Sequence, residues 1–151
     1  MPLWLKNVLN KPFVYISVFG CLFIVLIDQF FKYKIRQDGG FCLCNNGISF
    51  GVSLPISVFW LIASVSLLFL VSYFVFLHKQ PVFSLNFLFF GMGLLMGGAS
   101  SNLFDRFFFG CVLDYIFIFK KFFPVFNVAD ISISCGALFI LFSLIKKPKN
   151  C

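Results

Sequence analysis

Residues 12–31 read PFVYISVFGCLFIVLIDQFF, and this stretch decides the class of fold. It has no charged residue before Asp28, and it is long enough to cross a bilayer, which takes about 20 mostly apolar residues in a helix. The whole chain shares this character, with 61% hydrophobic and 11% charged residues among 151 and a mean hydropathy of +1.03. A soluble domain has about 25% charged residues. The sequence therefore predicts an integral membrane protein.

Further apolar runs follow the first one. We expect transmembrane helices at about 13–31, 56–77, 82–100 and 126–145, which makes residues 1–151 a single all-α polytopic domain. Glycines in the third run weaken a helix but permit close packing against a neighbour. These glycines are Gly91, Gly93, Gly97 and Gly98. Four spans place both termini on one side of the membrane and both long connections, roughly 32–55 and 101–125, on the other.

The charges give the orientation and the partners. Lysines and arginines divide equally between the two sides, but the dense basic tail from Lys146 to Lys149 favours cytoplasmic termini by the positive-inside rule. The net charge of +7 suits the anionic headgroups of membrane phospholipids. Nothing in the sequence indicates nucleic-acid binding. We therefore expect a multi-pass membrane protein with cytoplasmic termini and with its polar motifs on the opposite side of the membrane.

The acidic residues are few and are unusually placed. All five are aspartates, and four of them lie inside or beside apolar runs. A carboxylate at the bilayer centre costs ~2.5–3.5 kcal/mol on insertion scales. This placement favours chemistry or ion handling at the following residues: Asp28, Asp105, Asp114 and Asp130.

Two clusters have helical spacing. Asp28 and Lys32 are four residues apart and share a helical face, either as an interfacial ion pair or as support for a site. Asn102, Asp105 and Arg106 share a face if their segment is helical. Arg106 then either pairs with Asp105 at a helix end or reaches a catalytic carboxylate or a substrate.

The remaining two aspartates have different surroundings. Asn127 and Asp130 have the spacing of a helix N-cap and its third residue, so capping alone accounts for the pair. Asp114 lies in an apolar stretch with no local cation. If Asp114 meets Asp130, two carboxylates share one site and hold a single proton. An aspartic protease requires this arrangement, because one carboxylate activates water while the protonated one polarises the scissile carbonyl.

Other functional classes fit the residues less well. Residues 47–51 match G-x-S-x-G, but His78 lies about 30 Å away at 1.5 Å per helical residue. The usual zinc-ligand spacing is absent, and we expect no metal or organic cofactor. Disulfide pairing among Cys42, Cys44 and Cys111 stays open. The main alternative from another class is a small transporter or channel with a polar path lined by Asp, Asn and Arg, although no internal repeat is visible.

Five short motifs, in order, resemble those of bacterial lipoprotein signal peptidases (signal peptidase II). They are DQFFK at 28–32, NNGISF at 45–50, GGASSNLFDR at 97–106, VLDY at 112–115 and FNVAD at 126–130. The resemblance extends over all four expected spans. Two small residues depart from the family pattern, because Ser49 stands where alanine is usual and Ser101 where glycine is usual.

The resemblance implies a fold, a reaction and a set of site residues. The fold has four transmembrane helices with cytoplasmic termini, a small periplasmic β-cradle from the first long loop, and a short periplasmic helix. The implied enzyme lies in a bacterial inner membrane, acts on diacylglyceryl-modified prolipoproteins by cleaving before the lipidated cysteine, and binds cyclic-peptide inhibitors of the globomycin type. We expect it to be a monomer. Asp114 and Asp130 form the catalytic dyad. Supporting positions are Asp28, Lys32 and Asp105, and the site-lining positions are Asn45, Asn102, Arg106, Asn127 and Ala129.

Overall fold

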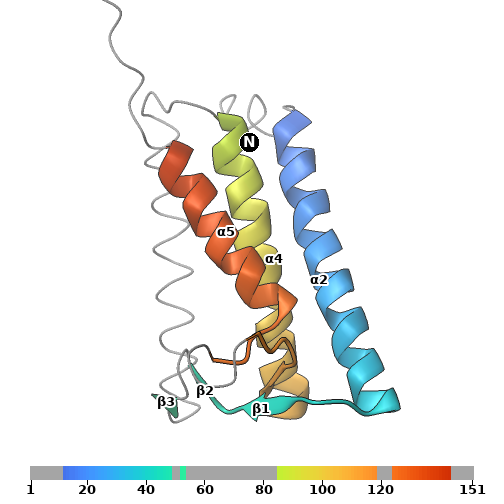
Figure 1. Cartoon of the computed structure of the whole chain (residues 1–151). Helices are drawn as coiled ribbons and strands as arrows, with labels where there is room; N and C mark the ends of the chain where they lie inside the picture. Colours follow the sequence, from blue (N-terminus) through green and yellow to red (C-terminus); the bar gives the residue numbers. More distant parts are fainter. Residues whose placement is uncertain (1–11, 49–51, 54–84, 119–123, 144–151) are drawn as a thin grey trace, which may run out of the picture.

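The computed structural model describes residues 12–48, 52–53, 85–118 and 124–143. Three helices form most of this part: α2 over Pro12–Asp38, α4 over Leu85–Phe109 and α5 over Val128–Ser143. α4 packs against both α2 and α5 and lies between them (Figure 1). The short strands gather at one end of the three helices (Figure 1).

Two of the helices are long and apolar enough to cross a membrane. These are the segments Val14–Asp38 and Asn86–Phe109, with hydropathies of 2.1 and 1.4. α5 is also apolar but has only 16 residues. The span expected at 56–77 lies outside the described residues. The described part is therefore helix-rich and has two candidate membrane spans.

The helix ends differ from the sequence-based boundaries. α2 continues to Asp38 instead of ending at 31, and α4 continues to Phe109 instead of ending at 100. Hydropathy marks the apolar part of a helix, whereas a polar helical turn extends past it. Gly39 and Gly110, with φ of 75° and 77°, follow the two helices directly, and left-handed glycines commonly end helices. The two long connections consequently begin later in the chain than expected.

The glycines of α4 explain its central position. A Cβ added at Gly91 would lie 2.7 Å from a carbonyl oxygen of α5, and one at Gly93 would lie 2.6 Å from a carbonyl oxygen of α2. Gly97 and Gly98 make similar close approaches to α2 and α5 respectively. The prediction that these glycines permit close packing is confirmed.

The strands connect segments that are distant in sequence. β1 (Leu43–Asn45) pairs antiparallel with β4 (Val112–Asp114), and β2 (Gly47–Ile48) pairs with β3 (Val52–Ser53). A strand of the first connection is thus paired with a strand of the second. The described elements outside α2, α4 and α5 are strands, and the short extra helix is not among them; residues 119–123 lie outside the described part.

Burial in the described part is the reverse of that in a soluble protein. Large apolar side chains of α2 face outward, with Phe19 71% and Leu26 69% exposed. The largest fully buried side chains are polar: Lys32, Asn127, Asp28, Asp105, Ser101 and Ser143. This pattern fits helices surrounded by lipid, where polar side chains must find partners inside the protein.

The close approach at Gly98 generates a stability prediction. A Cβ there would overlap the carbonyl oxygen of Ala129 on α5. We expect Gly98→Ala to lower the free energy of unfolding by about 1–3 kcal/mol, because backbone cannot yield as a flexible side chain does. Thermal unfolding in detergent measures this change. Gly20→Ala is the control, since a Cβ at Gly20 meets nothing within 4 Å; equal effects of the two variants would contradict the packing argument.

Candidate active site

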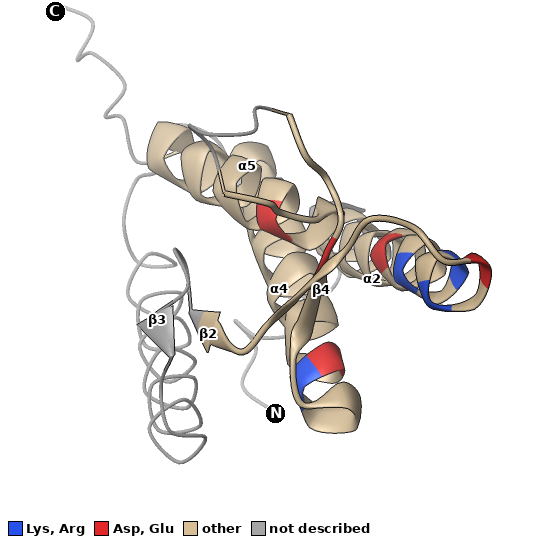
Figure 2. Ribbon diagram, turned by 60° about the horizontal axis from the view of Figure 1, so that its bottom comes forward, with Lys and Arg blue, Asp and Glu red and all other residues tan. Residues whose placement is uncertain are grey.

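Acidic side chains from several elements gather at the strand-bearing end of the helices. Figure 2 views the molecule from nearer this end and shows acidic positions on α2, α4, β4 and α5. The expected site residues of the described chain form one connected network there, although they come from distant segments. Its contacts form two groups. One is a buried ion-pair cluster, and the other is a pair of carboxylates connected by hydrogen bonds from asparagine side chains.

The ion-pair cluster is built on Lys32. Its Nζ lies 2.7 Å from Asp28 Oδ2 and 3.0 Å from Asp105 Oδ2, and all three side chains are fully buried. Lys32 also donates a hydrogen bond to Asn102 Oδ1 at 2.9 Å. The predicted pairing of Asp28 with Lys32 is confirmed, but it is a buried hub and not an interfacial ion pair.

Asp28 connects this hub to the rest of the site. Its Oδ2 accepts a hydrogen bond from Ser101 Oγ at 2.6 Å on α4. Its Oδ1 accepts one from the backbone N–H of Ala129 at 3.1 Å and one from the Tyr115 hydroxyl at 3.2 Å. Ala129 directly precedes Asp130, and Tyr115 directly follows Asp114. One carboxylate of α2 therefore holds the neighbours of both predicted catalytic residues.

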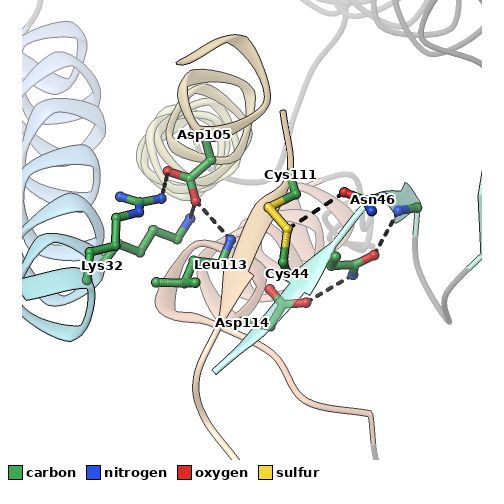
Figure 3. Close-up of a disulfide and its surroundings, with 10 residues drawn as sticks. Lys32, Cys44, Asn46, Asp105, Cys111, Leu113 and Asp114 are labelled. Carbon is green, nitrogen blue, oxygen red and sulfur yellow. Dashed lines mark hydrogen bonds and ion pairs between the residues drawn. A yellow bond between two sulfur atoms is a disulfide. The ribbon is translucent and has the colours of Figure 1, made fainter. Parts of the chain in front are cut away.

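Asp105 contacts partners that the sequence did not indicate. Its carboxylate accepts hydrogen bonds from the backbone N–H of Leu113 at 3.0 Å and from Arg36 Nη2 at 2.9 Å. The Leu113 contact fixes β4 just before Asp114 (Figure 3). Arg106, which is on the same helix, donates to the carbonyl oxygen of Gly47 in β2 at 2.8 Å. Asp105 and Arg106 thus hold two different strands.

The start of α5 combines capping with site formation. Asn127 Oδ1 accepts a hydrogen bond from the backbone N–H of Asp130 at 2.9 Å, and Asp130 Oδ2 accepts one from the backbone N–H of Asn127 at 3.2 Å. This reciprocal pair is a capping box. The capping interpretation is therefore confirmed, but it leaves the Asn127 amide nitrogen and Asp130 Oδ1 available for other contacts.

Three amides hold the two carboxylates. Asn127 Nδ2 donates to Asp114 Oδ1 at 2.7 Å, and Asn102 Nδ2 donates to Asp130 Oδ1 at 2.8 Å. Asn45 Nδ2 donates to Asp114 Oδ2 at 2.9 Å. Asn127 Nδ2 also approaches Asn102 Oδ1 at 3.3 Å, so the two carboxylates belong to one hydrogen-bonded unit.

The surroundings of Asp114 favour its protonated form. Burial raises the pKa of this carboxyl above its usual value, and the negative charge of Asp130 raises it further. The hydrogen bonds from Asn45 and Asn127 act in the opposite direction, because they stabilise the ionised form. The net result is a raised pKa, as expected for one member of a carboxylate pair that shares a proton.

Four residues of the network were not identified as site residues from the sequence: Gln29, Arg36, Ser101 and Tyr115. Arg36 lies one helical turn beyond Lys32. Because α2 reaches Asp38, this spacing places Arg36 on the same helical face as Lys32 and could have indicated it as a site residue. Gln29 donates to the Ser101 hydroxyl at 2.9 Å. Ser101 had been singled out only as a departure from the family pattern, whereas its hydroxyl is a direct partner of Asp28.

The structure shows which of the cysteines pair. Cys44 of β1 and Cys111, next to β4, form a disulfide, while Cys42 is exposed and has a free thiol. Within the described ranges, no group of three or more His, Cys, Asp or Glu side chains is arranged to hold a metal ion.

Known proteins resemble this chain over most of its length. Residues 20–146 match the family described as signal peptidase (SPase) II. Lipoprotein signal peptidases of Staphylococcus aureus strains JH9 and Newman are each 32% identical to this chain over 158 residues, covering 93% of it and 94% of the relative.

Two solved structures are also similar. Both are bacterial membrane enzymes determined by the in meso method and are 30% identical in sequence. The first has a TM-score of 0.73, and the match covers 89% of this chain and 93% of the solved chain. The second has a TM-score of 0.68, and the match covers 87% of this chain and 93% of the solved chain. With a family match over most of its length and relatives of this similarity, the chain belongs to the signal peptidase II family.

Proposed function

We propose that this protein is a membrane-embedded aspartic endopeptidase that removes signal peptides from diacylglyceryl-modified prolipoproteins, cleaving before the lipidated cysteine. Its family membership supports the reaction and the lipoprotein substrate. One observation supports the catalytic assignment: Asp114 and Asp130 are connected by hydrogen bonds through asparagine side chains at one end of apolar helices. The alternative of a transporter or channel is not favoured.

In the proposed mechanism the two aspartates share one proton. The ionised carboxylate takes a proton from water, and the water oxygen attacks the scissile carbonyl carbon. The protonated carboxyl donates a hydrogen bond to the carbonyl oxygen as negative charge develops there. Collapse of the tetrahedral intermediate breaks the C–N bond, and the amine of the lipidated cysteine leaves with a proton from the dyad.

The charges of the network support a single shared proton. Three cations of the site, Lys32, Arg36 and Arg106, accompany the carboxylates of Asp28, Asp105 and the dyad. With both dyad carboxylates ionised, the acids would exceed the cations by one. One proton on the dyad balances the cluster, which is favourable where burial penalises uncompensated charge.

The wider arrangement is proposed on the same basis. The chain is a single domain with four transmembrane helices and cytoplasmic termini, and its site faces the periplasmic side of the bacterial inner membrane. The strand pairs form the cradle for the substrate, and Asn45, Asn102, Arg106, Asn127 and Ala129 line the site. A monomer in contact with phospholipids suffices for this reaction. Cyclic peptides of the globomycin type should occupy the same site as the substrate.

The dyad assignment predicts loss of activity without loss of fold. Asp114→Asn and Asp130→Asn keep size but remove a carboxyl group that proton transfer requires. We expect each to lower kcat/KM for a lipidated prolipoprotein by about 100-fold or more. Asp38→Asn is the control, because the Asp38 side chain is 68% exposed and its ion pair with Lys34 is long, at 3.8 Å. Near-normal cleavage by either dyad variant would refute the assignment.

The hydrogen bond from Asn45 predicts a change in pH dependence. This bond stabilises ionised Asp114, so its removal raises the pKa of the carboxyl. Since loss of the shared proton ends activity, we expect the alkaline limb of the kcat/KM profile to move to higher pH in Asn45→Ala. Asn46→Ala, which changes an exposed neighbour, should leave the limb in place. A shift to lower pH would contradict the proposed role of the proton.

The orientation is tested by cysteine labelling in intact cells, in a background without native cysteines. A membrane-impermeant maleimide should modify Asp38→Cys, at the exposed end of α2, and spare Lys149→Cys. The opposite pattern would place the dyad on the cytoplasmic side, away from the proposed substrate.

A further inference from the structure

We propose that the Cys44–Cys111 disulfide is a positioning element for signal-peptide cleavage, because it holds β1 on β4 and thereby keeps the Asn45 amide on Asp114. The inference rests on the proposed function, since it assigns a role within the same site. Neither cysteine belongs to the sequence motifs or takes part in the proposed mechanism.

The geometry places the disulfide beside the dyad. Cys44 immediately precedes Asn45, and Cys111 lies three residues before Asp114. The two cysteine Cα atoms are 5.5 Å apart although the residues are separated by 67 positions in sequence. Figure 3 shows the bond bridging the two strands, with the Asp114 side chain close by on the same strand pair. The Asn45 amide reaches Asp114 Oδ2 at 2.9 Å across this pair.

Apart from the disulfide, the contacts near β1 are its short ladder with β4, the hydrogen bond from Arg106 to Gly47 just beyond it, and the ring contact of Phe41 with Phe117 just before it. Each strand has three residues, with Leu43 opposite Asp114 and Asn45 opposite Val112. Short two-stranded pairs are marginal in water without further packing. β4 is buried, whereas Leu43 and Cys44 of β1 are exposed, so β1 is the loosely packed partner. A covalent bond between distant segments restricts their separation, and β1 depends on that restriction.

Loss of the bond would act selectively on Asp114. Other groups that face this carboxyl come from elements anchored in the helices: Lys32 of α2, Arg106 of α4, Asn127 at the start of α5 and Asp130 of α5. Asn45 belongs to β1. When β1 separates from β4, Asp114 loses the Asn45 hydrogen bond while its helix-anchored neighbours stay in place.

The chemistry of the bond agrees with the proposed orientation. Two thiols form the disulfide by losing two protons and two electrons to an oxidant, which we take to be a disulfide-bearing oxidoreductase that is reduced to its dithiol. Such bonds persist outside the reducing cytoplasm. The bond and the proposed periplasmic site therefore require the same side of the membrane.

The test uses the full chain carrying Cys42→Ser, because the exposed Cys42 thiol would otherwise exchange with the disulfide. The double variant Cys44→Ser/Cys111→Ser, Asn45→Ala and their combination are compared for cleavage of a lipidated prolipoprotein across pH. We expect the double variant to lose about tenfold in kcat/KM and to shift its alkaline limb upward, as Asn45→Ala does. The combination should show no further shift, because both changes remove one contact.

Reduction of the folded parent protein with a phosphine is the second measurement. It should reproduce the shift of the alkaline limb, whereas the double serine variant should not respond. Cys135→Ser, which changes a free cysteine of α5, is the matched control and should retain the profile of the parent. An unshifted limb in both the double variant and the reduced parent would overturn the positioning role, even if the rate fell.

A measurement without turnover separates this proposal from the proposed function. The titration of Asp114, followed by carboxyl ¹³C NMR, should move to higher pH on reduction of the disulfide. A parent protein that shows this shift but does not cleave prolipoprotein would refute the proposed function and retain the positioning of Asn45. A titration that is the same in both redox states would overturn the positioning itself.

Discussion

The buried ion pair between Asp28 and Lys32 is the constraint on which the rest of the site depends. The pair is fully inaccessible, and removing one partner of such a pair typically costs about 3–5 kcal/mol because an uncompensated charge is left behind. Asp28 also binds the backbone of α5 at Ala129 and the hydroxyl of Tyr115. A displacement of α2 would therefore move the residues adjacent to both carboxylates of the proposed dyad. The helices can approach closely enough for these contacts because α4 presents glycines to both neighbours.

A polar interior of this kind is stable only if its hydrogen-bonding capacity is satisfied. Among the described residues, no buried side-chain nitrogen or oxygen lacks a partner. Fully satisfied buried networks are rigid, whereas partly satisfied ones are costly. The outward-facing apolar side chains of α2 complete this arrangement, since lipid offers polar groups no alternative partner. The membrane thus enforces the network that holds Asp114 and Asp130.

The sequence predicted the features that depend on local spacing. The pair Asp28 and Lys32, the cap at Asn127 and the packing glycines all follow from helical periodicity. The motifs also predicted which residues meet. Hydropathy could not predict how far α2 and α4 extend, because polar helical turns resemble loops. Pairing of β1 with β4 joins segments separated by long stretches of chain, and no local pattern encodes its register or the choice of Cys44 over Cys42.

The start of α5 shows that capping and catalysis are compatible interpretations of the same residues. Asn127 uses its carbonyl oxygen to cap the helix and its amide nitrogen to bind Asp114. Asp130 Oδ2 accepts the reciprocal hydrogen bond from the backbone N–H of Asn127. Burial raises the pKa of the Asp114 carboxyl, and the hydrogen bond from Asn127 opposes that rise. The contacts that begin the helix therefore also position the amide that binds Asp114.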